Sequence, residues 1–316
     1  MNFIKHTNEF DIFQVQTGEI INQQGQGQAQ ADEWRLLRRL RLPDQLNRGT
    51  TGNVRRGLIV DVETTGLSLV NDEVVQIGLL PFTYEPETGR ILDIDHANAY
   101  EGIREPRVPI SEEATLISGL TQEMLVGKEI QNVTVEDLVE QAGIVIAHNA
   151  RFDRVMVEKL WPAFASKHWG CSFNGVDWLR EGFTVGKLDY LGYQFGLFFE
   201  RHRALSDCEA CLALLAQSLP SGKTVLEEVR TSALKKDYLI PAVESPFEAK
   251  DILKERGYQW RGKELPNGGV WWTIVGDPES EFDWLHQEIY RCQKNLPIIE
   301  INALNRYSER IWNKST

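Results

Sequence analysis

The chain has few cysteines, no long apolar run and no excess of positive charge. Its four cysteines are too few and too scattered for a disulfide framework: Cys171, Cys208, Cys211 and Cys292. No apolar run approaches the roughly 18 residues that a membrane span needs, and the amino terminus lacks the basic start and apolar stretch of a signal peptide. We therefore expect a soluble, cytoplasmic protein without a membrane partner.

The pair Cys208 and Cys211 has the spacing of a zinc or redox site. It lies in an apolar helical pattern, however, and the sequence has no second pair of this spacing. We therefore interpret both residues as core cysteines.

The net charge of −12 argues against a protein that coats nucleic acid by bulk attraction. It does not exclude an enzyme that acts on nucleic acid, since metal ions can supply positive charge locally. Charge is also unevenly distributed along the sequence: the stretch from Arg35 to Arg56 contains seven arginines and only one acid, Asp44.

Composition and apolar periodicity divide the 316 residues into five segments. The glutamine-rich start predicts a flexible tail. The next segment fits a short basic amphipathic helix at 34–42, which either packs on the main domain or contacts nucleic acid. The five segments are a flexible tail (1–33), an arginine-rich helical segment (34–56), the main domain (57–219), a helical linker (220–245) and a small α+β C-terminal domain (246–316).

The main domain begins with strands and continues with alternating helices and a strand. Short loops between the first three strands indicate an antiparallel meander. This order favours a three-layer α/β fold with a mixed sheet. The predicted strands are 57–63, 73–82, 90–100 and 143–147; the predicted helices are 111–118, 121–125, 133–142, 150–160 and 204–219.

Two acids end the first strand of this domain, Asp61 and Glu63. Side chains alternate across a strand, so both carboxylates share one face while Val62 points to the other. Two neighbouring carboxylates repel and raise each other's pKa unless a cation neutralises them. Hard divalent ions with oxygen ligands are the usual remedy, so this pair indicates a metal site.

Two further motifs carry acids and histidines. In His148-Asn149-Ala150-Arg151-Phe152-Asp153, the acid lies in the first turn of a helix, where the helix dipole favours a charged carboxylate. His148 is best explained as a structural residue bonded to a neighbouring loop. In His202-Arg203-Ala204-Leu205-Ser206-Asp207, the histidine precedes a helix on a loop, and histidine is suited to taking a proton near neutral pH.

Together the four carboxylates can hold two divalent ions, the arrangement used for phosphodiester hydrolysis. The motifs resemble those of the DEDDh exonucleases, the superfamily of the proofreading epsilon subunit of bacterial DNA polymerase III and of ribonuclease T. The family patterns D-x-E-T-T-G-L, H-N-x-x-F-D and H-x-A-x-x-D match residues 61–67, 148–153 and 202–207. Ser118 departs from the family's H-G-I-T segment, and Gln76 stands where many members have Glu.

The resemblance covers about residues 57–219 and implies a ribonuclease H-like fold with a mixed five-stranded sheet. It implies 3′→5′ cleavage that releases nucleoside monophosphates. The implied ligands of two Mg²⁺ or Mn²⁺ ions are Asp61, Glu63, Asp153 and Asp207, and the implied general base is His202. The implied substrate-binding residues are Thr64, Thr65, Gly66, Leu67, Asn149, Phe152 and His202.

Several alternatives remain open from the residues alone. Leu67 and Phe152 either grip a base or pack in the core, and Asn149 either bonds a phosphate or caps its helix. The substrate is either DNA or RNA. For DNA, we expect the 3′ end of a single strand, a role in repair or proofreading, and a polymerase or repair complex as partner. An inactive nucleic-acid-binding scaffold is the least favoured interpretation, because all five chemical positions are intact.

The C-terminal domain resembles a small module appended to some bacterial exonucleases of this superfamily. Its aromatic residues alternate with lysines and arginines and either hold a single strand or form the core of the domain. They are Tyr258, Trp260, Trp271 and Trp272. We expect helices at 247–256 and 279–294, a hairpin joining 258–260 to 270–275, and a strand at 297–301.

Overall fold

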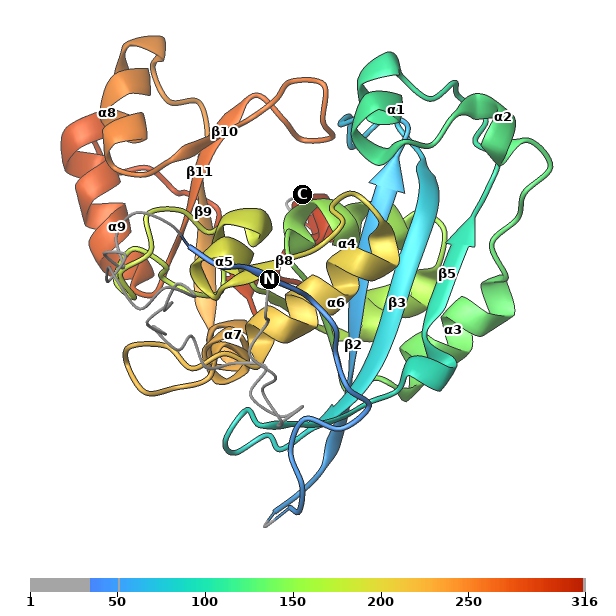
Figure 1. Ribbon diagram of the computed structural model, residues 1–316. Helices are drawn as coiled ribbons and strands as arrows, with labels where there is room; N and C mark the ends of the chain where they lie inside the picture. Colours follow the sequence, from blue (N-terminus) through green and yellow to red (C-terminus); the bar gives the residue numbers. More distant parts are fainter. Residues whose placement is uncertain (1–34, 51, 315–316) are drawn as a thin grey trace, which may run out of the picture.

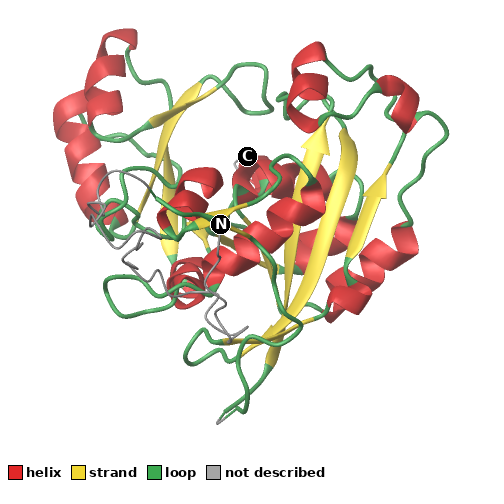
Figure 2. Cartoon of the chain, in the orientation of Figure 1, coloured by secondary structure: helices red, strands yellow, loops and turns green. Residues whose placement is uncertain are grey.

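The computed structural model describes residues 35–50 and 52–314. The predicted flexible tail, residues 1–33, lies outside them. The described chain forms a large α/β unit and a smaller sheet with its own helices (Figures 1 and 2). Within these residues, no helix has both the length and the apolar character required to cross a membrane.

The main sheet has the strand order β4-β3-β2-β6-β7, and β5 also pairs with β3. β2 runs antiparallel to β3 and parallel to β6. This confirms the predicted three-layer, ribonuclease H-like fold with a mixed sheet, to which β5 adds a sixth strand. The strands are β2 (Arg55–Thr64), β3 (Val74–Tyr84), β4 (Ile91–Ile94), β5 (Tyr100–Ile103), β6 (Ile144–Ala147) and β7 (His168–Cys171).

The predicted single strand at 90–100 is instead two strands. Asp95 follows β4, and its side chain accepts a hydrogen bond from the Asn98 amide, which caps a turn of 3₁₀ helix at His96–Asn98. After this turn the chain returns to the sheet as β5 and pairs with Gln76–Leu79, the other half of β3.

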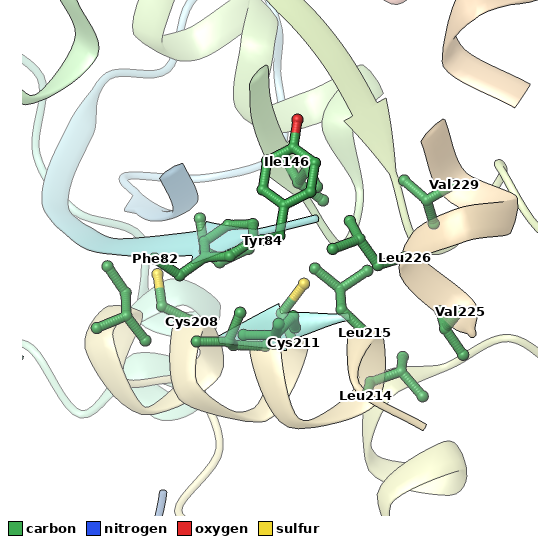
Figure 3. Packing of buried hydrophobic residues seen from close by; sticks show 14 of the residues in the cluster. Phe82, Tyr84, Ile146, Cys208, Cys211, Leu214, Leu215, Val225, Leu226 and Val229 are labelled. Carbon is green, nitrogen blue, oxygen red and sulfur yellow. The ribbon is translucent and has the colours of Figure 1, made fainter. Parts of the chain in front are cut away.

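Helices cover both faces of the sheet. Leu58 and Val60 on β2 face α3 (Asn132–Gln141) and α4 (Ala150–Glu158). Ile59 points to the opposite face, where it packs with α6 (Ala204–Leu215) and α7 (Val225–Leu234). Figure 3 shows this second core, with Cys208 and Cys211 of α6 facing Phe82 and Tyr84 of β3. The remaining elements of this unit are α1 (Glu112–Ser118), α2 (Gln122–Leu125), 3₁₀ helix Pro162–Ser166, α5 (Leu188–Gln194) and β8 (Leu197–Phe198).

The cysteine prediction is confirmed for the pair on α6. Cys208 and Cys211 are free thiols buried in this core. Burial raises the pKa of Cys211 to about 12, so it stays a protonated, unreactive thiol near neutral pH.

The segment predicted as a basic helix at 34–42 is extended over the residues described. Its strand β1 (Arg38–Arg39) pairs in parallel with β8. Residues 39–42 read Arg-Leu-Arg-Leu, which is the period of a strand: Leu40 is buried while Arg39 and Arg41 are exposed. The helical prediction for this part of the 34–56 segment is therefore wrong.

The smaller sheet has the order β10-β11-β9-β12. The predicted hairpin is confirmed, because β10 pairs antiparallel with β11. Its elements are β9 (Asp237–Ala242), 3₁₀ helix Phe247–Ala249, α8 (Lys250–Glu255), β10 (Gln259–Arg261), β11 (Val270–Val275), α9 (Pro278–Trp284), a π-helical turn (Leu285–Tyr290), β12 (Ile299–Ile301) and 3₁₀ helix Glu309–Lys314.

The predicted helical linker at 220–245 is only partly helical. α7 fills its first half, but β9 follows and becomes a central strand of the smaller sheet. Pro241 argues against a central strand because proline cannot donate to a ladder. The structure accommodates it because β12 pairs only with Asp237–Leu239, before the proline is reached.

The aromatic residues of the smaller unit serve mainly as its core. Tyr258 and Trp272 are buried. Trp260 is the exception, with 47% of its surface exposed, and it packs edge-on against Trp271 with ring centroids 5.4 Å apart.

A buried arginine joins the two units. Arg154 of α4 donates hydrogen bonds to the backbone carbonyls of Leu304 and Arg306, each at 2.7 Å. At the edge of the main sheet, the Trp169 backbone donates to the carbonyl of Ala303 at 2.9 Å. The C-terminal segment therefore contacts both α4 and the edge strand β7.

Candidate active site

The end of β2 presents two carboxylates to the face covered by α6. Asp61 lies opposite Gly78 of β3, and Glu63 lies opposite Gln76. Their side chains continue the row of Ile59, which packs against α6. Asp61 and Glu63 therefore stand where this apolar row ends and the N-terminus of α6 begins.

Gly78 lets the start of α6 approach the sheet closely. A Cβ at Gly78 would come within 2.4 Å of the backbone carbonyl carbon of Ala204. The Cys208 thiol also donates to the Gly78 carbonyl at 3.3 Å, and the Ala204 amide donates to Oε1 of Gln76 at 3.4 Å. The glutamine that replaces the family's usual Glu thus binds the N-terminus of α6.

This packing brings His202 and Asp207 to the carboxylates of β2. Ligand-type atoms of Glu63, His202 and Asp207 all lie within 4.8 Å of one another. Asp207 lies in the first turn of α6, and its carboxylate accepts a hydrogen bond of 3.2 Å from the Arg203 amide.

Asp153 reaches the same place from α4. It is 4% exposed, and its Oδ1 accepts a hydrogen bond of 3.2 Å from the Val62 amide. β6 pairs with β2 only as far as Ile59, so the Val62 amide lies beyond the ladder and is available to this carboxylate. Asp153 therefore lies directly beside the strand that carries Asp61 and Glu63.

Burial raises the pKa of all four carboxyl groups, and repulsion from other members of the cluster adds to the rise for Asp61, Glu63 and Asp153. For Asp61, burial is the largest cause, followed by the charges of Asp153, Asp207 and Glu63, and its pKa lies well above the usual value. Burial raises the pKa of Glu63 to about 7, that of Asp153 to about 8 and that of Asp207 to about 6. Such a cluster of oxygen donors is suited to hard divalent cations, which relieve this repulsion.

His202 lies on the loop before α6 in a left-handed backbone conformation, with φ of 59°. It is exposed. Partial burial and the nearby charge of Arg201 lower its pKa below 6.5. The imidazole is therefore mainly neutral at pH 7 and can accept a proton.

The loop after motif one is held by a residue that the sequence analysis missed, Asp72. Its carboxylate accepts hydrogen bonds from the Thr65 hydroxyl and the Ser68 amide, both at 2.7 Å. A Cβ at Gly66 would lie 2.7 Å from this carboxylate, so a larger residue there would displace Asp72 from its hydrogen bonds. Thr64 is also internally bonded, since its hydroxyl donates to the Gly66 carbonyl at 2.6 Å.

The remaining candidates for substrate contact differ in how exposed their side chains are and in what they bond. Leu67 is 78% exposed, which excludes the core-packing alternative and leaves the side chain free to contact a ligand. Phe152 is half-buried against the core on the α4 face. Asn149 precedes α4, and within the described residues its side chain makes no capping hydrogen bond.

His148 behaves as the sequence predicted. Its Nδ1 is 2.9 Å from the Ser172 hydroxyl, on the loop after β7. Burial lowers the pKa of His148 to about 4, so it stays neutral and structural.

Comparison with known proteins agrees with this geometry. A mixed sheet with clustered carboxylates at the end of its central strand is the arrangement expected of the ribonuclease H-like class. A family model described as "Exonuclease" (RNase_T) matches residues 58–215, which is half of the chain. The protein therefore belongs to this exonuclease family.

Relatives with curated descriptions include DNA polymerase III PolC-type from Listeria innocua, 28% identical over 188 residues, and from Thermotoga petrophila, 30% identical over 218 residues. These alignments cover 57% and 63% of this chain but only 12% and 14% of the polymerases.

Similar solved structures include Exonuclease X in complex with 5′ overhanging duplex DNA, with 25% identity and a TM-score of 0.40 over 56% of this chain and 99% of that one. E. coli Exonuclease I in complex with a dA16 oligonucleotide has 13% identity and a TM-score of 0.45, over 70% of this chain and 63% of that one.

Proposed function

We propose that the protein is a metal-dependent 3′→5′ exonuclease that removes nucleoside 5′-monophosphates from DNA. The observation that carries the proposal is the convergence of four carboxylates and His202 at the end of β2. Polarity is drawn from the resemblance of the three motifs to the DEDDh family.

The residues fit two divalent ions. Asp61, Glu63, Asp153 and Asp207 would hold Mg²⁺ or Mn²⁺, since all are oxygen donors and their pKa values show mutual repulsion or unfavourable burial. When bound, the ions would supply positive charge against the charge that develops on the phosphodiester during hydrolysis.

The protein's own groups have distinct roles. Neutral His202 takes a proton from the attacking water as general base. The loop 64–67, held by Asp72, receives the terminal nucleotide, with Leu67 exposed to contact its base. Asn149 and Phe152 complete the proposed substrate contacts on the α4 side.

DNA is favoured over RNA by the relatives, which are named as DNA polymerases. On this basis we place the enzyme in DNA repair or proofreading-like editing in the cytoplasm, with a polymerase or repair complex as partner. Since the alignment covers a small part of each polymerase, RNA trimming is the alternative that the experiment must separate.

The test is a time course on matched DNA and RNA single strands labelled at the 5′ end, with Mg²⁺ or EDTA. We expect a ladder of DNA products that shortens from the 3′ end and requires the metal. Asp61→Asn should abolish it, while Asp137→Asn, which changes an exposed acid on α3, should have no effect. Faster degradation of RNA would reassign the substrate, and release of the 5′ label as a mononucleotide would contradict the polarity.

A further inference from the structure

The extended segment before the main domain lies against the loop that carries His202. This loop, residues 199–203, runs from β8 to α6. β1 pairs with β8 through two hydrogen bonds of 2.8 Å, from the Arg38 amide to the Gly196 carbonyl and from the Leu40 amide to the Phe198 carbonyl.

Side-chain packing strengthens this contact. Leu40 is 7% exposed and packs with Leu197 of β8 and with Ala210 and Ala213 of α6. Leu40 therefore fills the space between the two elements that flank the histidine loop. The pair between Arg39 and Glu200 is long, at 3.9 Å, and exposed, so it contributes little.

The segment is also fixed at its other end. The Leu46 amide donates to the Leu92 carbonyl at 2.8 Å, and the Ile94 amide donates to the Asp44 carbonyl at 2.7 Å. Residues 35–50 thus connect the histidine loop to β4 at the edge of the main sheet (Figure 1). Attachment at both ends leaves the intervening residues little freedom to move.

His202 needs such support because its left-handed conformation is unfavourable for a residue with a side chain. A non-glycine residue keeps this conformation only where its surroundings enforce it. On the C-terminal side the packing of Ala204 on Gly78 fixes the backbone. On the N-terminal side the support comes from β8 and from the segment paired with it.

We propose that residues 36–42, which we call the strap, position His202 for catalysis, with Leu40 as the positioning residue. The proposal rests on the role of His202 given above. Leu40 contacts β8 and α6 rather than β2 or α4, which carry Asp61, Glu63 and Asp153. Asp207 lies on α6, about one turn before the Leu40 contact at Ala210, but it is held by the Arg203 amide and by the packing of Ala204 on Gly78. We therefore expect the strap to affect the base more than the metal ligands. If so, the activity of the catalytic domain depends on residues that precede this domain in the sequence.

The first experiment is kinetic. Leu40→Ala in the full chain should lower kcat at least tenfold, since a displacement of about 1 Å in a catalytic group can cost on the order of 100-fold. KM for the oligonucleotide and the affinity for Mn²⁺ should stay within about twofold, and Leu40→Ile should restore most of the activity. The matched controls are Leu36→Ala, at a leucine of the strap that is 77% exposed, and Arg39→Ala.

The second experiment needs no activity. Arg201 and Arg203 flank His202, so trypsin can report on the freedom of this loop. Cleavage after either arginine should be at least tenfold faster in Leu40→Ala than in wild type or Leu36→Ala. If the wild type degrades no nucleic acid, the proposed function fails, but this measurement still tests the strap.

Three results would overturn the proposal. One is wild-type kcat in Leu40→Ala, and another is cleavage of the loop at the wild-type rate. The third is a parallel loss of kcat and of Mn²⁺ affinity, which would show that Leu40 stabilises the whole domain rather than His202.

Discussion

The carboxylate cluster predicts that the metal-free protein loses stability as the pH rises. A carboxyl group whose pKa is raised on folding binds its proton more tightly in the folded chain. Its contribution to stability is therefore complete below the pKa of the unfolded chain and is lost as the pH rises through the folded pKa. For Glu63 this range runs from 4.5 to about 7, and for Asp153 from 3.8 to about 8.

Glu63→Gln tests this prediction with a change of nearly equal shape. Each tenfold change in acidity is worth about 1.4 kcal/mol, so raising the pKa of Glu63 from 4.5 to about 7 costs on the order of 3 kcal/mol at pH 8.5. The neutral amide avoids this cost. Without metal at pH 8.5, the variant should therefore unfold roughly 5 °C above the wild type.

The assay is thermal unfolding followed by circular dichroism in EDTA at pH 5.5 and 8.5, repeated with Mg²⁺. The advantage of Glu63→Gln should be smaller at pH 5.5, and Mg²⁺ should stabilise the wild type more than the variant. Asp137→Asn is the control for loss of an ordinary exposed acid. The reasoning is refuted if, in EDTA at pH 8.5, Glu63→Gln unfolds at or below the wild-type temperature.

Two further substitutions test the supports of the site. Gly78→Ala should force α6 away from the sheet, because its Cβ would lie 2.4 Å from the Ala204 backbone. Urea unfolding should show that this variant loses about 2 kcal/mol or more of stability. Gly143→Ala is the control and should change stability little, because its Cβ would meet only the Arg56 carbonyl oxygen, at 3.4 Å. Asp72→Ala should release the Thr65 hydroxyl and so raise KM for a DNA oligonucleotide about tenfold in steady-state assays. An unchanged KM would show that the loop holds its shape without this carboxylate.

The main fold could be predicted because its signals are local. The buried strands β2 and β6 are apolar runs, and Ser111 caps α1, since its hydroxyl accepts a hydrogen bond from the Ala114 amide. The errors occur where tertiary pairing decides the outcome. β1 is a strand because β8 lies beside it, and β9 holds Pro241 because its neighbour β12 ends before that residue.

The same distinction explains which parts of the site were found. Asp61 and Glu63 could be placed on one face because alternation along a strand is a property of the sequence itself. Gly78 gave no such signal: its importance arises only when Ala204, from a distant part of the chain, packs on it. Asp72 was missed for a related reason, since its role depends on a loop folding back onto Thr65.

These missed residues share a physical task. The site combines carboxyl groups whose pKa values are raised with a histidine in an unfavourable backbone conformation, and neither is stable by itself. Close packing of α6 on the sheet brings Asp207 to the carboxylates of β2 despite their repulsion, and pairing of β1 with β8 supports the loop of His202. The motifs therefore identify the groups that we propose react, while the surrounding packing determines whether those groups can be held together.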